Sequence, residues 1–425
     1  MSTLRKRLRV TSVVAGIGIV AVLVAGCARG GDTGDSGGDA SEGPAEASPG
    51  ITDTTLTFGI TSPLTGATAG PGNCTVDGAL AYFGVKNDEG GIEFGDGKTR
   101  TVEIKAYDDG YDPQKALANF QQMVSDGVFA AGIGLGTPTN RAWREAAIDE
   151  GVPQVLVMTG DPLFSDRAES PEQLGLVPIY QQEGGAFGEL LAASDQPHKV
   201  AILSQNDDYG KGYVEGFKDA ISGADNIEVV GELTYEATDT SVDAQLTELA
   251  ASGADVFFNA MSITPLVISS LQKAQQIGWL PSWFLPSNTS SPTAILEPGG
   301  GAAFPGIYSV SFSQAAAAPT FADSPDGKAF LDAIAEYTDQ DGVPAFPHCV
   351  WSWIAAATLE QAFMKMEEPT RESFMTALES IKDFKAPLML EGSTIDTTQD
   401  GKPAVSSVIV QKYNGKGYAT AENFG

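Results

Sequence analysis

The chain has 425 residues, of which 42% are hydrophobic and 19% are charged, a balance typical of globular proteins. Its formal net charge of −30 arises from 55 acidic and only 25 basic residues. A chain this acidic offers no basic face to phosphate groups, so we expect it to bind neither nucleic acid nor anionic lipid surfaces.

The N-terminal segment indicates export. Four basic residues lie between positions 5 and 9, and residues 10–24 are apolar or small at all but two positions. A run this short favours a secretory signal over a membrane-spanning helix, which needs about 20 apolar residues. The segment ends in Val24-Ala25-Gly26-Cys27, which resembles a bacterial lipobox. We expect a signal peptide over residues 1–26 and a lipid on Cys27; the alternative is an ordinary signal peptide with a chance cysteine.

The next stretch, up to residue 50, has the composition of a tether. Residues 28–50 are rich in Gly, Ser, Asp, Glu, Pro and Ala and contain no bulky apolar side chain. Such a segment cannot bury enough surface to offset its chain entropy. We therefore expect residues 27–50 to form a lipidated leash, which anchors an extracytoplasmic domain to the bacterial cell membrane without embedding it.

Two further cysteines, Cys74 and Cys349, follow the tether. An exported protein folds where disulfides can form, so an even pair favours a bridge between them. The alternative is that both are buried thiols.

From residue 51 onward the sequence alternates between strand and helix patterns. The first run has expected strands at 56–62, 102–108, 129–135 and 155–158, with helices at 77–87, from 112 and at 137–150. The second run has helices at 182–194, 212–221, 243–252 and 265–277 and strands at 200–204, 228–233 and 256–260. Further helices are expected at 346–366 and 372–381, and a hairpin at 393–411 around Asp400-Gly401. Alternation of this kind predicts an α/β fold with two doubly wound, parallel-sheet lobes.

Ligands of such sheets bind beyond the carboxyl ends of the strands. The most informative strand end is the glycine-rich segment 131–140, in which Thr137 opens a helix. Free N–H groups at a helix start favour an anionic group such as a carboxylate. The alternative is that Thr137 only caps its own helix. The spacing departs from G-x-G-x-x-G, because Thr137 stands where the last glycine is needed, and no phosphate loop is present, so we expect no nucleotide cofactor.

Catalytic and metal-binding patterns are scarce. The only histidines are His198 and His348, and neither belongs to a recognisable hydrolase or metalloprotease motif. The segment 396–401 lacks the closing glutamate of a calcium loop. Acid pairs at 108–109 and 207–208 are explained as solvated loop acids or helix-start charges. We expect binding without chemistry and no metal.

Several segments, in order and at the right spacing, carry a family resemblance. They are Gly59-Ile60-Thr61-Ser62-Pro63-Leu64-Thr65-Gly66, Asn87-Asp88-Glu89-Gly90-Gly91-Ile92, Tyr107-Asp108-Asp109, Asp112-Pro113, residues 147–153, Lys199-Val200-Ala201-Ile202-Leu203, Asp208-Tyr209-Gly210 and residues 254–258. From about Leu56 to its C-terminus, the chain resembles the leucine/isoleucine/valine-binding family of type I solute-binding proteins. These are the extracytoplasmic receptors of ABC importers.

The resemblance implies the type I periplasmic binding protein fold, with lobes joined by three crossover segments near 176–180, 307–312 and 388–394. Lobe I would comprise residues 51–178 plus 312–388, and lobe II residues 179–311 plus 389–425. The implied protein is a monomer whose partners are a small-molecule ligand and the permease and ATPase subunits of an ABC transporter.

The resemblance also implies a binding site. Gly136 and Thr137 would bind a ligand carboxylate, Thr159 would help to hold an amino group, and Tyr209 would cover the ligand from lobe II. Two positions depart from the family: Ser287 stands where amino-acid binders carry an acid, and Met261 stands where an aromatic residue is usual. Since an unpaired buried ammonium is costly, the sequence favours a carboxylate, amide or aromatic acid without a free amine.

Two other classes of protein fit the same sequence. A sensor on this fold would use the same cleft without transport, and a neighbouring kinase gene rather than permease and ATPase genes would indicate it. A secreted hydrolase or reductase on a two-lobed frame would reveal itself by turnover of a substrate.

Overall fold

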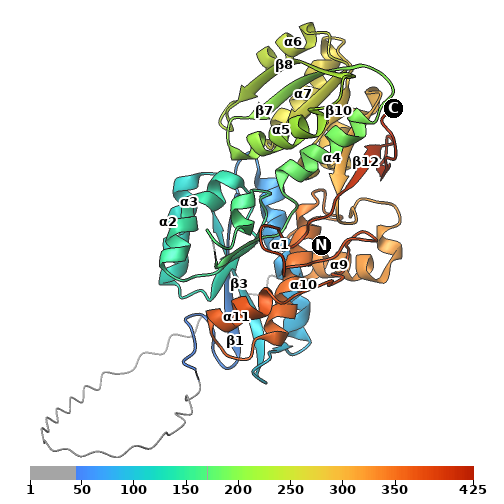
Figure 1. Cartoon of the computed structure of the whole chain (residues 1–425). Helices are drawn as coiled ribbons and strands as arrows, with labels where there is room; N and C mark the ends of the chain where they lie inside the picture. The colour runs from blue at the N-terminus through green and yellow to red at the C-terminus, as the bar shows by residue number, and fades with distance from the viewer. Residues whose placement is uncertain (1–44, 170) are drawn as a thin grey trace, which may run out of the picture. The chain divides into compact units, whose positions relative to one another are not determined.

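The computed structural model describes residues 45–169 and 171–425. The expected signal peptide, the lipidated Cys27 and most of the expected tether lie outside these residues. Within them the chain forms two sheets, each covered by its own helices (Figure 1). No helix in the described ranges is long and apolar enough to cross a membrane.

The first sheet and its helices make up lobe I. Its order is β2-β3-β1-β4-β5-β6, and every pairing except that of β2 with β3 is parallel. The strands are β1 (Thr55–Ser62), β2 (Ile92–Glu93), β3 (Thr99–Asp108), β4 (Ala130–Gly132), β5 (Gln154–Val157) and β6 (Gln173–Gly175). The helices are α1 (Ala69–Asp88), α2 (Pro113–Ser125), α3 (Thr137–Asp149), α9 (Pro325–Tyr337), α10 (His348–Lys365) and α11 (Arg371–Leu378).

The second sheet and its helices make up lobe II. Its order is β13-β12-β11-β10-β9-β7-β8, with the last two strands of the chain antiparallel at one edge. The strands are β7 (His198–Gln205), β8 (Ile227–Tyr235), β9 (Val256–Ala260), β10 (Ser282–Phe284), β11 (Ile307–Ser311), β12 (Ile409–Tyr413) and β13 (Tyr418–Thr420). The helices are α4 (Tyr180–Ala192), α5 (Asp208–Ile221), α6 (Asp243–Ala251), α7 (Thr264–Gln276) and the short α8 (Glu297–Gly299).

Both faces of each sheet are buried, as parallel sheets require. In β7, Val200 and Ile202 pack with α4 and α5, whereas Ala201 and Leu203 pack with α6 and α7. In lobe I, α2 and α3 cover one face, and α1, α9, α10 and α11 contribute to the core on the other. The predicted α/β fold with two mostly parallel lobes is therefore confirmed.

A disulfide joins two helices of lobe I. Cys74 of α1 is bonded to Cys349 of α10, and their Cα atoms lie 4.2 Å apart. The bond holds the start of α10 against the first half of α1.

The chain passes between the lobes after β6, after β11 and before β12. The first passage follows Gly175 and covers the expected 176–180, whereas the second follows Ser311, at the end of the expected 307–312. The third lies nearer to 405–409 than to 388–394, because Met389 pairs with Ser313 and the chain then turns back to lobe I. Ala404 N donates to the carbonyl of Gly175 at the end of β6, and Val405 N donates to that of Leu176. Both side chains pack in the lobe I core. Residues 389–405 were expected to belong to lobe II. Most of them belong with lobe I instead.

The C-terminal hairpin also differs from expectation. Asp400 and Gly401 do not form its turn, because they bond to the backbone of Arg167 and Ser165 respectively. The hairpin instead joins β12 to β13 around Asn414-Gly415, where Asn414 Oδ1 accepts two backbone N–H bonds. Asn-Gly and Asp-Gly are both strong hairpin signals, and the bonds of Asp400 and Gly401 to lobe I leave Asn414-Gly415 as the turn.

Candidate ligand-binding pocket

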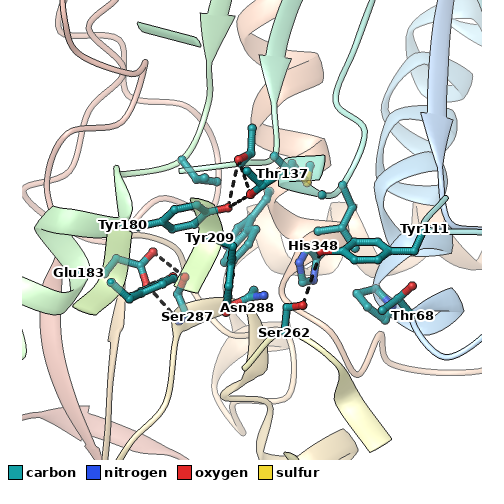
Figure 2. A pocket seen from close by; sticks show the side chains of 18 residues that line it. Thr68, Tyr111, Thr137, Tyr180, Glu183, Tyr209, Ser262, Ser287, Asn288 and His348 are labelled. Atoms are coloured by element: carbon teal, nitrogen blue, oxygen red, sulfur yellow. Dashed lines mark hydrogen bonds between the residues drawn. The ribbon is translucent and has the colours of Figure 1, made fainter. Parts of the chain in front are cut away.

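A pocket lies where strand ends of lobe I face loops and helix starts of lobe II (Figure 2). The side chains that line it nearly fill it, leaving about 30 Å³ for the centre of a water-sized sphere. Lobe I and the first crossover contribute Thr68, Pro71, Tyr111, Leu135, Gly136, Thr137, Met158, Thr159, Val177, His348 and Trp351. Lobe II contributes Tyr180, Glu183, Tyr209, Tyr213, Ser262, Ser287 and Asn288.

Three hydroxyl groups meet on the upper side of the pocket in Figure 2. Thr137 Oγ1 lies 2.9 Å from Thr159 Oγ1 and 2.8 Å from Tyr180 Oη, and Thr159 Oγ1 lies 3.0 Å from Tyr180 Oη. We call these residues the hydroxyl triad. Each hydroxyl has one proton and two lone pairs, so a closed ring of three bonds leaves acceptor capacity on every oxygen. The triad brings together Thr137 and Thr159, which the sequence placed on separate strand ends.

Gly136, not Thr137, is the N-cap of α3. Its φ of 114° lies in the region that favours glycine, and a Cβ there would come within 2.8 Å of the Tyr111 ring. The Thr137 hydroxyl does not cap the helix; it points into the triad instead. The interpretation of Thr137 as a mere cap is therefore wrong.

Tyr209 crosses the pocket from the start of α5. Its Oη donates to Asn288 Oδ1 at 3.0 Å and lies 3.3 Å from the carbonyl oxygen of Met261. The side chain of Met261 packs in the lobe II core and does not line the pocket, whereas its neighbour Ser262 does. Asp207 caps α5 by accepting from Gly210 N, and this bond helps to fix the helix turn that carries Tyr209.

A buried carboxylate stands beside Ser287. Glu183, on the first turn of α4, accepts bonds from Ser287 N at 3.1 Å, Ser287 Oγ at 2.8 Å and Tyr213 Oη at 2.8 Å. Only 1% of Glu183 is exposed, and burial raises the pKa of its carboxyl to about 7. The sequence disfavours a ligand amine because Ser287 has no acidic neighbour in the chain. In the structure Glu183 is that acidic neighbour. Because Glu183 lies on a helix, inspection of strand ends could not find it.

Tyr111 is a second lining residue that the sequence argument missed. Its φ is 65°, an uncommon backbone angle for a residue with a side chain, and its N–H donates to Asp109 Oδ1 at 2.8 Å. Asp109 is fully buried and also accepts from Thr61 Oγ1, and burial raises its pKa to about 6. Tyr111 Oη lies 3.5 Å from Ser262 Oγ of lobe II. Strain of this kind concentrates at functional sites.

The comparisons with known proteins agree with this geometry. A family model described as "Periplasmic binding protein" matches residues 55–417, which span both lobes. The chain belongs to the periplasmic binding protein family. The resemblance found in the sequence is thereby confirmed.

Two curated relatives of this periplasmic binding protein carry amino-acid-binding names. The leucine-, isoleucine-, valine-, threonine- and alanine-binding protein of Pseudomonas aeruginosa is 25% identical over 78% of this chain and 84% of its own length. The Leu/Ile/Val-binding protein homolog 3 of Brucella melitensis is 27% identical over 48% of this chain, and the match spans about half (53%) of that relative's length.

Solved structures share the fold. A branched-chain amino acid ABC transporter protein from Thermus thermophilus with bound valine has a TM-score of 0.76 at 15% identity, covering 88% of this chain and 97% of the other. A fatty acid ABC transporter substrate-binding protein from Thermomonospora curvata has a TM-score of 0.74 at 22% identity, covering 89% and 95% respectively.

An ion pair also joins the two lobes of this periplasmic binding protein. Arg141 of α3 pairs with Asp208 of α5, with Nη1 and Oδ2 2.9 Å apart. Arg141 also binds Asp161 of its own lobe, which holds the guanidinium in place. Arg141, Tyr111 and the hydroxyl triad thus each contact lobe II.

The described part of the chain contains no candidate metal site. No group of three or more His, Cys, Asp or Glu side chains could hold a metal ion there. His198 bonds to Asp255 and Ser194, and Asp108 accepts several bonds that hold the loop after β1. These acids and this histidine therefore have structural partners of their own.

Proposed function

We propose that the chain is a lipid-anchored, extracytoplasmic solute-binding protein that delivers a small organic solute to an ABC importer. The solute is an amino acid, an amide or a carboxylate. The observation that supports this most is the pocket itself, because polar groups of both lobes line it and no single lobe could enclose a ligand.

Binding proceeds by closure of the two lobes. The ligand first meets lobe I, where Thr137 and Thr159 present hydroxyl groups beside the start of α3. Lobe II then brings Tyr209, Glu183 and Ser287 to the other side. Since these lobe II contacts are made only in the closed form, the ligand favours closure by its higher affinity for that form.

Among these solutes, an α-amino acid fits the pocket best. An amino acid presents an ammonium group, which needs a negative partner when it leaves water. Glu183 supplies that charge at the place where Ser287 alone could not, and a nearby ammonium would in turn lower the raised pKa of Glu183. The amino-acid-binding name of the Pseudomonas aeruginosa relative supports the same class of solute.

A thermal-shift screen tests the proposal. Residues 45–425 lie within one compact unit, which includes Ser48, whose backbone and side chain bond to Pro369 and Arg371. A ligand present at 100 times its dissociation constant should add about 2.7 kcal/mol of stability. We expect a shift with one or more amino acids and a much smaller one with their des-amino analogues. A shift with des-amino acids alone would instead support the amine-free ligand favoured by the sequence.

The lipid anchor requires its own experiment. When the full chain is expressed in a bacterium fed a labelled fatty acid, the label should appear on the protein and the protein should sediment with membranes. A Cys27→Ala variant should lose both properties. Membrane retention of that variant without label would contradict a lipid anchor at Cys27.

A sensor on the same fold remains the alternative to transport. Reconstitution with the permease and ATPase encoded nearest to this gene distinguishes them, since only a transport receptor stimulates ATP hydrolysis and solute uptake there.

A further inference from the structure

His348 lies at the pocket on a rigid support. It is the first residue of α10, between Pro347 at the N-cap and the disulfide-bonded Cys349. Its ring packs on the indole of Trp351, with ring centroids 4.6 Å apart at an angle of 55°. Trp351 is itself fixed, because its Nε1 donates to Ser313 Oγ at 3.0 Å. The imidazole therefore has little freedom to turn towards another partner.

Both ring nitrogens of His348 are buried without a partner. Only 1% of the residue is exposed, and neither Nδ1 nor Nε2 has a hydrogen-bond partner within the described residues. Buried polar groups are nearly always paired, and an unpaired group lowers stability. A buried histidine with two unpaired nitrogens on a pocket wall indicates a partner that enters with the solute.

The charge state of His348 limits what that partner can be. Burial lowers the pKa of the imidazole to about 3, so the ring is neutral at physiological pH. A neutral imidazole has one N–H donor and one nitrogen acceptor. A hydroxyl or carboxamide group can pair with either nitrogen, whereas an aliphatic side chain can pair with neither.

The position of His348 assigns it to a different part of the solute from Glu183. In Figure 2, Tyr209 stands between the two, and His348 lies on the side of Tyr111 and Ser262. Thr68 lies on this side as well (Figure 2). A solute whose ammonium is held at Glu183 would therefore present another group to His348.

We propose that His348 is a ligand-contacting, specificity-determining residue that hydrogen-bonds a neutral polar group, a hydroxyl or a carboxamide, on the solute. This inference rests on the proposed function. It makes the preferred solute a polar one and disfavours the aliphatic side chains of leucine, isoleucine and valine.

Four probes of similar shape test the proposal by isothermal titration. Leucine and asparagine have an amine and differ in the end of the side chain; 4-methylpentanoate and succinamate repeat that difference without the amine. We expect asparagine to bind at least tenfold more tightly than leucine. His348→Phe should abolish this preference, and His348→Gln should retain part of it, because its carboxamide again offers a donor and an acceptor. Tighter binding of leucine, or an unchanged preference in His348→Phe, would overturn the proposal.

The ligand-free variants give a second readout that needs no solute. If the nitrogens are unpaired until the solute arrives, they destabilise the ligand-free protein. His348→Phe removes them and should therefore raise the melting temperature of the ligand-free protein by about 2 °C or more. An unchanged or lower melting temperature would mean that His348 is already satisfied, and the proposal would fail. If no probe binds the wild-type protein, the proposed solute class is wrong. The melting temperatures of the ligand-free variants still decide the role of His348.

Discussion

Thr137 shares its hydroxyl with two neighbours, and this arrangement makes its role separable from stability. In a Thr137→Val variant, Thr159 and Tyr180 can still bond to each other at 3.0 Å. We expect solute affinity to fall by about 1–3 kcal/mol, because a polar contact is lost in a buried site. Unfolding free energy should change by less than about 1 kcal/mol, and titration calorimetry with denaturant melts measures both.

The control for Thr137 is Thr247→Val. Thr247 is an exposed residue of α6 whose hydroxyl donates only to the carbonyl oxygen of Asp243. The Thr247→Val variant should bind the solute with the affinity of the wild type. An equal loss in both variants would mean that Thr137 does not contact the solute.

Glu183 makes the ligand-free protein sensitive to pH. Its carboxyl has a pKa of about 7 in the folded protein against 4.5 for the free group, so the folded state holds a proton that the unfolded state releases. Its contribution to stability is therefore fully present below pH 4.5 and is lost as the pH rises through 7. We expect a loss on the order of 3 kcal/mol across that window.

Urea unfolding at several pH values isolates this effect. The stability difference between Glu183→Gln and the wild type should change steadily from pH 5 to pH 8 in favour of the variant. Glu189→Gln, at an exposed position of the same helix, should run parallel to the wild type. Parallel curves for all three proteins would mean that Glu183 does not titrate in this range.

At the scale of elements, α1 and α10 approach closely because Gly78 has no side chain. A Cβ at position 78 would lie 2.3 Å from the carbonyl oxygen of Cys349. Alanine stabilises a helix by about 1 kcal/mol relative to glycine. We nevertheless expect Gly78→Ala to destabilise the protein by about 1–3 kcal/mol, because the added methyl group overpacks the contact. Gly185→Ala in α4 is the matched control, because a Cβ at position 185 would lie 3.5 Å from its nearest neighbour, the carbonyl oxygen of Gly216. We expect this variant to be as stable as the wild type or more stable. Chemical denaturation that ranks the two variants the other way would refute this packing argument.

The disulfide acts on the same pair of helices. Cys74 and Cys349 are 275 positions apart, so the bond restricts a long loop of the unfolded chain. Removing it through the double variant Cys74→Ser and Cys349→Ser should cost about 2–5 kcal/mol. Reductant should lower the stability of the wild type by the same amount in melting experiments. It should not change the stability of the double variant. Intact-mass analysis of the wild type should find two hydrogens fewer than the reduced chain, and free thiols there would contradict the bridge.

At the scale of the whole molecule, closure depends on contacts that join the lobes. The Arg141–Asp208 pair is partly exposed, with 37% and 45% of the side chains accessible, so its contribution is small and salt-dependent. Asp208→Asn should weaken solute affinity about two- to fivefold at low salt and less at high salt, because the closed form becomes less populated. Titration at two salt concentrations measures this effect.

The control for closure is a pair within one lobe. Lys218 and Glu232 form an ion pair of similar exposure inside lobe II, 2.6 Å apart. Glu232→Gln should leave solute affinity unchanged. Equal weakening in both variants would show that general electrostatics, and not closure, controls binding.

Most elements could be predicted because their signals are local. Val256–Ala260 is a buried strand as expected, and Asp112 with Pro113 begins α2, with the Asp112 carboxylate accepting from two backbone N–H groups. The hairpin at 400–401 and the third crossover were misplaced because long-range pairing decided them. Met389 pairs with Ser313 in an antiparallel bridge and Gly401 N donates to Ser165 O, and no local pattern encodes such partners.

The sequence by itself determined the α/β alternation, the family resemblance and the placement of Thr137 and Thr159 at strand ends, because hydrophobic periodicity and strand-end position are properties of neighbouring residues. Only the tertiary structure decided that Glu183 stands beside Ser287 and that His348 lines the pocket without a partner. Both groups owe their properties to burial. Burial raises one pKa and lowers the other, and it depends on elements that are far apart in the chain and meet only when both lobes have folded.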